Sequence, residues 1–304
     1  MHSRNPLPYL ALGIGILALA MSAIFVRWAA APGAVNGFYR MAMAALVMLP
    51  VLLLARSRRP KDLPWPGVWF AVLAGAGFAL DLTLWNTAVN FTTAANAVLL
   101  ANMAPLWVGL GALIFFKEHL QRGFWIGLLL ALCGAFLIAG TDFLRHPRLG
   151  WGDALALGAS VGYAGYYLAT QSGRRWLDSL SFFWIYTACC AAILLVTSLA
   201  LRQPLTGYSL ATYGWFLALA LVTQVGGYLA LVYAIGHLSA SVVSPTMLGQ
   251  PLITAILAVP LLGEGLSWTQ IVGGTVVIGG VWLVHRSHQH ARAEVPRPIL
   301  TADG

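Results

Sequence analysis

The sequence predicts an all-α integral membrane protein, with ten transmembrane helices arranged as two inverted five-helix repeats around a central cavity. Three observations support this fold class: the scarcity of charge, the long apolar segments and an internal repeat. Charged residues make up 9% of the chain and apolar residues 60%, whereas charged residues are about 25% of an ordinary soluble domain. Because so little charge cannot cover a surface that faces water, we expect the chain to lie in a lipid bilayer.

Ten apolar segments are long enough to cross a bilayer, which takes roughly 20 mostly apolar residues. They lie at approximately 8–28, 34–55, 66–89, 94–115, 122–141, 151–172, 179–200, 210–235, 240–261 and 267–285. The first could be a cleaved signal peptide, since Arg4 precedes it and three alanines follow it. Its length and its place in the repeat favour a retained helix. We expect a disordered cytoplasmic tail at 287–304.

The stretch 92–140 recurs 146 positions later without a gap. The equivalent residues include the pairs Pro105 and Pro251 (251 − 105 = 146), Glu118 and Glu264, Gly127 and Gly273, and Gly134 and Gly280. Weakly similar halves inside one hydrophobic chain are common in transporters. We therefore expect one five-helix unit at 6–143 and a second at 150–286.

Basic residues in the connecting loops predict the orientation. With a cytoplasmic N-terminus, the inner loops and tails hold twelve Lys and Arg residues and the outer loops three, which is a positive-inside bias. Because each half has an odd number of helices, the second half enters the membrane from the opposite side, and the repeat is inverted. The net charge of +8 thus reflects topology, and no folded soluble surface is left for nucleic acid. Both termini are expected in the cytoplasm of a bacterial inner membrane.

Two charged residues, Arg40 and Asp81, lie well inside predicted spans, whereas Arg27, Arg122 and Asp153 lie near span ends. Ionisable groups in a bilayer are costly unless they are paired or hydrated, so they are candidate functional groups. The two could form an ion pair that only fixes packing. The equivalent positions of the second repeat, 146 residues later, hold Tyr186 and Gly227, so the charges exist in one half only. Our hypothesis is that Asp81 is a protonatable coupling group or that Arg40 binds a substrate carboxylate.

Prolines interrupt one predicted span in each half. Pro105 and Pro251 lie mid-span and free the carbonyl groups of Ala101 and Met247. The kinks could be static consequences of packing. Since they occur in both halves, we favour a matched pair of hinges.

Polar and aromatic side chains near mid-span are candidates for a cavity wall, since pockets combine aromatic walls with a few polar groups. Packing is the alternative for each. The candidates are Trp85, Asn102, Tyr163, Gln224, Tyr228 and Gln250.

The order of several motifs resembles the EamA branch of the drug/metabolite transporter superfamily, over residues 8–285. The motifs are Ser22 to Arg27, Phe38-Tyr-Arg40, Asp81-Leu-Thr-Leu-Trp85, Ala94 to Pro105, Lys117-Glu118 and Gly263-Glu264. The resemblance implies two five-helix halves around a central cavity and the export of small metabolites such as amino acids. It does not identify the metabolite.

These features predict a secondary transporter that exports small metabolites by alternating access, with protons as a candidate coupling ion. An importer and an uncoupled facilitator are the alternatives. A non-transporting receptor or scaffold is disfavoured by the inverted repeat, and an intramembrane enzyme by the lack of a catalytic or metal-binding constellation. We expect no cofactor, since no Gly-x-x-x-x-Gly-Lys-Ser/Thr run is present. Glycine pairs in the spans near 122–141 and 267–285 could pack within a monomer or between copies in a homodimer.

Overall fold

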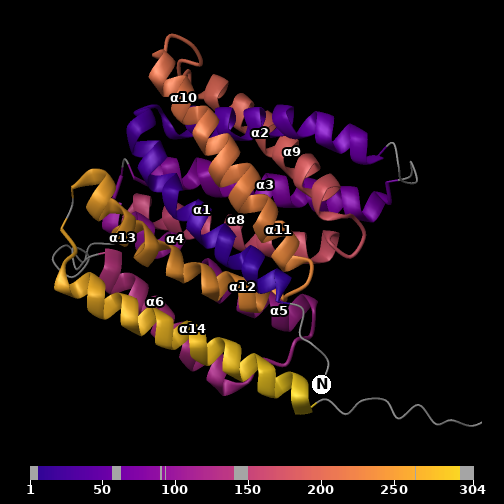
Figure 1. Ribbon diagram of the computed structural model, residues 1–304, viewed down its shortest axis with the longest axis vertical. Coiled ribbons are helices and arrows are strands. Elements are labelled where there is room, and N and C mark those ends of the chain that lie inside the picture. The colour runs from indigo at the N-terminus through magenta and orange to yellow at the C-terminus, as the bar shows by residue number, and fades with distance from the viewer. Residues whose placement is uncertain are drawn as a thin grey trace, which may run out of the picture.

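The computed structural model describes residues 6–56, 63–89, 91, 92, 94–139, 150–263 and 265–294. These residues form helices and connecting turns, without a strand (Figure 1). The helices of the first half are α1 (Leu7–Ala29), α2 (Gly33–Arg56), α3 (Trp65–Ala88), α4 (Ala94–Ala101), α5 (Ala104–Phe115) and α6 (Arg122–Ala139). Those of the second are α8 (Trp151–Gly173), α9 (Ser179–Ala200), α10 (Leu210–Ala218), the π-helix η1 (Leu219–Tyr228), α11 (Leu229–Ile235), α12 (Ala240–Thr246), the 3₁₀ turn η2 (Met247–Gly249), α13 (Gln250–Leu262) and α14 (Trp268–Glu294).

Within the described residues, nine membrane-length helical spans are apolar enough to cross a bilayer by composition. Helix α8, with 23 residues, is as long as the others but is not among them. Its sequence is rich in glycine, tyrosine and alanine, because it packs closely along α3 and does not need large apolar side chains there. With α8 as the tenth span, the predicted all-α membrane fold is confirmed.

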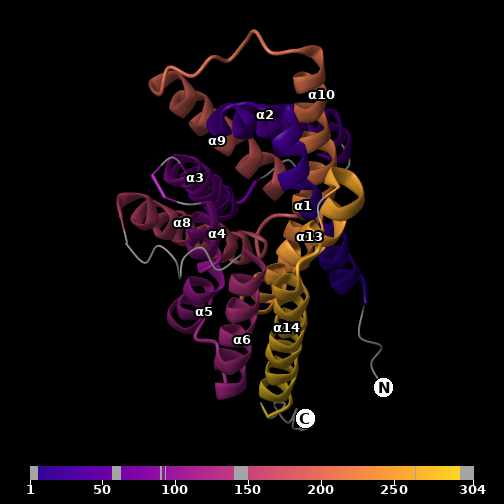
Figure 2. The same ribbon diagram turned by 90° about the vertical axis from the view of Figure 1, so that its left-hand side faces the viewer.

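The pairing of α6 with α14 displays the inverted symmetry (Figures 1 and 2). A Cβ atom built on Gly127 would lie 2.7 Å from the carbonyl oxygen of Gly280, and one built on Gly134 would lie 2.6 Å from that of Gly273. The 146-residue offset converts the first contact into the second. These glycines therefore let two equivalent antiparallel helices touch backbone to backbone within one chain.

The remaining contacts between the halves come in matched sets. Helices α2 and α9, which occupy equivalent places in the two halves, pack against each other. Helix α3 packs on α8, and its counterpart, the α10–η1–α11 span, packs on α1. The two halves are thus interleaved rather than joined along one flat surface.

The two spans that contain the equivalent prolines Pro105 and Pro251 are interrupted where the sequence predicts a kink. Helix α4 ends at Ala101 and α5 begins at Ala104, with Pro105 in the first turn of α5. In the second half a 3₁₀ turn separates α12 from α13, and Pro251 lies in the first turn of α13. Whether these interruptions act as hinges stays a prediction.

Helix α14 is longer than predicted. It continues to Glu294, so residues 287–294 of the predicted disordered tail are helical, and 295–304 lie outside the described residues. The difference arises because hydropathy marks the part of a helix that lies in lipid and not its end. The Arg286 guanidinium lies 5.2 Å from the ring centroid of Trp282, one turn earlier. The start of α1 lies beside this part of α14, with Tyr9 and His285 rings 6.1 Å apart.

Candidate functional site

A cavity of about 550 Å³ lies between the two halves. Its lining reaches the helix ends that carry Arg27, Gly33, Asn86 and Gln270, and the loop charges predict this side to be the outer one. Its described lining comprises Ser22, Ala23, Ile24, Val26, Arg27, Gly33, Asn36, Gly37, Arg40, Leu82, Trp85, Asn86, Val98, Ala101, Asn102, Ile138, Leu219, Gln250, Pro251, Thr254, Ala255, Ala258, Leu262 and Gln270.

Half of the residues singled out from sequence lie on this wall. They are Arg40, Trp85, Asn102, Gln250 and Pro251. Gln250 also fixes the packing of α13 on α1, because its Nε2 donates a hydrogen bond to the Leu19 carbonyl at 3.1 Å. The other five, Asp81, Tyr163, Gln224, Tyr228 and Pro105, are not among the lining residues.

The backbone of Asp81 lies at the contact of α3 with α8, and Asp81 is not among the residues that line the cavity. A Cβ atom built on Gly162 of α8 would be 3.0 Å from the Asp81 backbone nitrogen, whereas Leu82 and Trp85 of α3 face the cavity. Arg40 acts on Asp81 electrostatically. Among the described residues, however, the structure records no ion pair or hydrogen bond between the two side chains.

Arg40 lies at the boundary between the cavity and the aromatic core. Its side chain is 6% exposed, and its Nη1 donates a long hydrogen bond of 3.5 Å to Ser22 Oγ. The guanidinium carbon lies 5.6 Å from the Phe78 ring centroid and 5.8 Å from that of Tyr228. At these distances the rings stabilise the cation through their quadrupoles. Among the described residues, Nε and Nη2 of the guanidinium have no hydrogen-bond partner.

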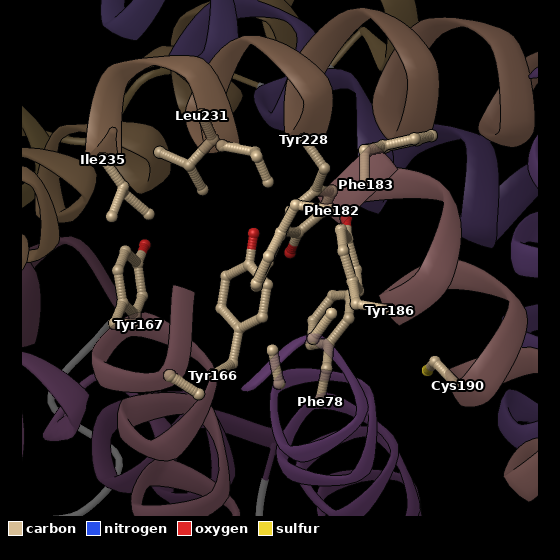
Figure 3. Close-up of a cluster of buried hydrophobic side chains, with 14 of the residues drawn as sticks. Phe78, Tyr166, Tyr167, Phe182, Phe183, Tyr186, Cys190, Tyr228, Leu231 and Ile235 are labelled. Carbon is tan, nitrogen blue, oxygen red and sulfur yellow. The ribbon is translucent and has the colours of Figure 1, made fainter. Parts of the chain in front are cut away.

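The aromatic core explains why Tyr163, Tyr228 and Gln224 are not on the wall. Figure 3 shows Phe78, Tyr166, Tyr186 and Tyr228 converging from α3, α8, α9 and η1. Gln224 is fully buried, and its Nε2 donates to Tyr186 Oη at 2.7 Å. The sequence indicates the depth of these residues correctly, but the direction in which each one points depends on the rotation of its helix.

The opposite end of the molecule is closed by a polar network that joins the two halves. Glu118, between α5 and α6, accepts hydrogen bonds from Gln171 Nε2 at 3.1 Å and from Ser241 Oγ at 2.5 Å. Gln171 Oε1 in turn accepts from the Ala240 backbone at 2.5 Å, where α12 begins. In the sequence Glu118 marks the repeat and a family motif, but its hydrogen-bond partners come from distant segments. Its equivalent, Glu264, lies outside the described residues.

Helix α8 is tethered at its other end as well. Asp153, in the first turn of α8, accepts hydrogen bonds from Thr92 Oγ1 at 2.6 Å and from Asn96 Nδ2 at 3.3 Å. Thr92 and Asn96 lie at the start of α4, the counterpart of the start of α12. One helix thus holds the first turns of both interrupted spans, through Asp153 at one end and Gln171 at the other.

Membrane-length helices in two inverted halves, with a cavity between them whose lining reaches the helix ends on one side, define a multi-pass membrane transporter. Comparison with known proteins identifies the family. The model of the EamA-like transporter family matches residues 7–140 and, a second time, residues 150–286. The chain belongs to this family.

Individual relatives agree with this assignment. The chain is 28% identical to the uncharacterized transporter YcbK of Bacillus subtilis over 89% of each chain. It is 26% identical to a probable terminal-alkyne amino-acid exporter of Streptantibioticus cattleyicolor over 84% of each chain. It is 27% identical to the pseudopaline exporter CntI of Pseudomonas aeruginosa over 83% of this chain and 84% of the relative. A solved crystal structure shares the fold, with a TM-score of 0.75 at 17% identity, over 94% of this chain and 98% of the other.

Proposed function

We propose that the protein is a secondary transporter that exports small metabolites, amino acids or related compounds, across the bacterial plasma membrane by alternating access. One observation carries the proposal: the lining of the cavity between the halves reaches the helix ends on one side, while the Glu118 network joins the halves at the other. A transporter held in one of two alternating states has this form. In the orientation predicted from the loops, the side that the cavity reaches is the outer one.

Export is favoured over import by the relatives. Two similar proteins carry names that describe exporters, one of an amino acid and one of pseudopaline. The cavity geometry alone would serve either direction, because an alternating-access carrier passes through the same states both ways. The loop charges add that the closed end, which carries Glu118, faces the cytoplasm.

The test is growth of cells that overproduce the protein across a panel of toxic amino acids and their analogues. Export predicts resistance to at least one class of compound. Ala101→Trp, which fills the cavity, should abolish the resistance, and Ala192→Trp, on an exposed position of α9, should preserve it. Sensitisation instead of resistance would show import. Equal growth of cells with the Ala101→Trp and Ala192→Trp variants would mean that the substrate does not pass through the cavity.

Proton coupling is the second part of the proposal, with Asp81 as the carrier. Asp81 is close enough to Arg40 to interact electrostatically, so its protonation changes the field at the cavity wall. Uptake into everted vesicles should follow an imposed pH gradient, and Asp81→Asn should remove that dependence without abolishing exchange. A gradient response that persists in Asp81→Asn would exclude Asp81, and no response in the native protein would favour an uncoupled facilitator.

A further inference from the structure

We propose that Arg40 and Asn36 form a subsite that binds a carboxylate group of the transported molecule. The inference deepens the proposed function and rests on it in one respect, that the ligand of the cavity is the transported molecule. Both residues line the cavity from α2. They are four positions apart, so their side chains lie one above the other on the same helix face.

Unpartnered polar atoms mark the subsite. Among the described residues, Arg40 Nε and Nη2 have no hydrogen-bond partner, and neither has the side-chain oxygen or nitrogen of Asn36. Both side chains are more than nine-tenths buried, with exposures of 6% for Arg40 and 3% for Asn36. Buried polar groups in native proteins are normally hydrogen-bonded. Four such atoms, in two residues that line the cavity, therefore point to a ligand that completes them.

The geometry of the free atoms selects a carboxylate. Nε and Nη2 form one edge of the guanidinium, which presents two nearly parallel N–H groups. Two carboxylate oxygens match such an edge with paired hydrogen bonds. Asn36 Nδ2 can donate to the same oxygens, and Oδ1 can accept from an ammonium group next to the carboxylate. A single guanidinium edge and one amide are few donors for a phosphate dianion.

The charge of the wall agrees with an anionic group. Its described part contains two arginines, Arg27 and Arg40, and no aspartate or glutamate. A cleft of one sign with low-dielectric walls concentrates ligands of the opposite sign. Asp81 is not among the residues that line the cavity and makes no recorded bond to Arg40, so it leaves the Nε–Nη2 edge unpaired. The rest of the wall combines apolar side chains such as Leu82, Val98 and Ile138 with amides such as Asn102 and Gln250.

The subsite can be tested by thermal unfolding of the purified full chain in detergent. The probes are the twenty standard amino acids, small 2-oxo acids, inorganic phosphate and the amides of the amino acids. We expect at least one carboxylate probe to raise Tm and its uncharged-carboxyl amide to have no effect. Arg40→Gln should abolish the shift or move it to at least tenfold higher concentration, while Arg202→Gln, an exposed loop arginine, should respond as the native protein does.

Two further variants keep the test valid if Arg40→Gln fails to fold. Asn36→Asp keeps the size of the side chain and adds a charge that repels a carboxylate, so the Tm shift should be lost. Arg40→Lys keeps the charge without the paired edge and should respond more weakly than the native chain. A carboxylate response unchanged in all foldable variants, stabilisation by phosphate alone, or no carboxylate response in the native chain would each overturn the subsite.

Binding and transport fail separately in this design. If carboxylates stabilise the protein through Arg40 but no panel compound crosses the membrane of proteoliposomes, the exporter proposal is wrong and the subsite stands. If transport proceeds unchanged in Arg40→Gln, the subsite is wrong and the exporter proposal stands.

Discussion

Tyr186 accepts a 2.7 Å hydrogen bond from Gln224, and the same two positions in the first half hold Arg40 and Phe78 (40 + 146 = 186, 78 + 146 = 224). There the contact is a cation over a ring, at 5.6 Å. One geometric relationship has thus been kept in both halves with different chemistry. The second half closes on itself with a neutral hydrogen bond, while the first half keeps a charge beside the cavity.

The Tyr186–Gln224 pair is therefore expected to serve stability. Tyr186→Phe leaves the buried Gln224 amide without its acceptor, which costs about 1–3 kcal/mol. The thermal midpoint in detergent should fall by roughly 2–6 °C, given a few degrees per kcal/mol for a chain of this size. Ligand-induced shifts should persist. Combining Tyr186→Phe with Gln224→Leu should recover part of the loss, and a double variant no better than the single one would contradict the pairing.

Glu118 is expected to hold the inner end closed. Glu118→Gln removes an acceptor from the bonds with Gln171 and Ser241. Because Glu118 is only half-buried, we expect a loss of about 1 kcal/mol, or roughly a fivefold shift toward the inner-open state. Hydrogen–deuterium exchange at the start of α12 should rise accordingly. Lys117→Gln, at the exposed neighbouring position, is the matched control, and equal exchange in both variants would exclude the gate.

Pro105 and Pro251 are expected to keep their spans flexible and not to stabilise the protein. Pro105→Ala and Pro251→Ala restore a backbone N–H in spans that are interrupted beside each proline, and they remove the pyrrolidine ring that prevents the helix from continuing through the interruption. Each variant should be as stable as the native chain or more so, and should transport several-fold more slowly. Transport rates in proteoliposomes check this. Native rates in the double variant would mean that the interruptions are static.

Glycine spacing on α14 offers a sharp test of the fold. A Cβ atom on Gly280 would lie 2.4 Å from the Ala131 backbone nitrogen, whereas one on the neighbouring Gly279 would meet nothing within 4 Å. Gly280→Ala should therefore cost about 1–3 kcal/mol by overpacking. Gly279→Ala should be neutral or slightly stabilising. The measurement is the free energy of unfolding of both variants in detergent, and equal stability would refute the close contact of α6 with α14.

The sequence was sufficient for the fold because its signals are long and redundant. Twenty-residue apolar runs, the loop charges and the 146-residue repeat each constrain the same architecture. For the cavity, counting polar groups inside spans located Arg40, Trp85, Asn102 and Gln250, which the structure places on the wall. Their roles in transport stay predictions.

The rest of the candidate site depends on contacts between helices that the sequence alone does not reveal. Asn36 is a single amide near a helix start, and only its burial in the cavity wall distinguishes it. The Glu118 network unites three segments separated by 53 to 123 positions. Such contacts follow from how the helices are rotated and packed, which hydropathy and spacing leave undetermined.

Helix α8 has a consequence for how the chain is made. It is long enough to span the bilayer but is not apolar enough to be recognised by composition, so its partition from the insertion machinery into lipid is weak on its own. Its close glycine contact with α3, where a Cβ on Gly77 would lie 2.8 Å from the Gly162 carbonyl oxygen, supplies what composition lacks. Synthesis delivers α3 first. We therefore expect the first half to assist the entry of α8 into the membrane, and the second half made alone to lose its first crossing.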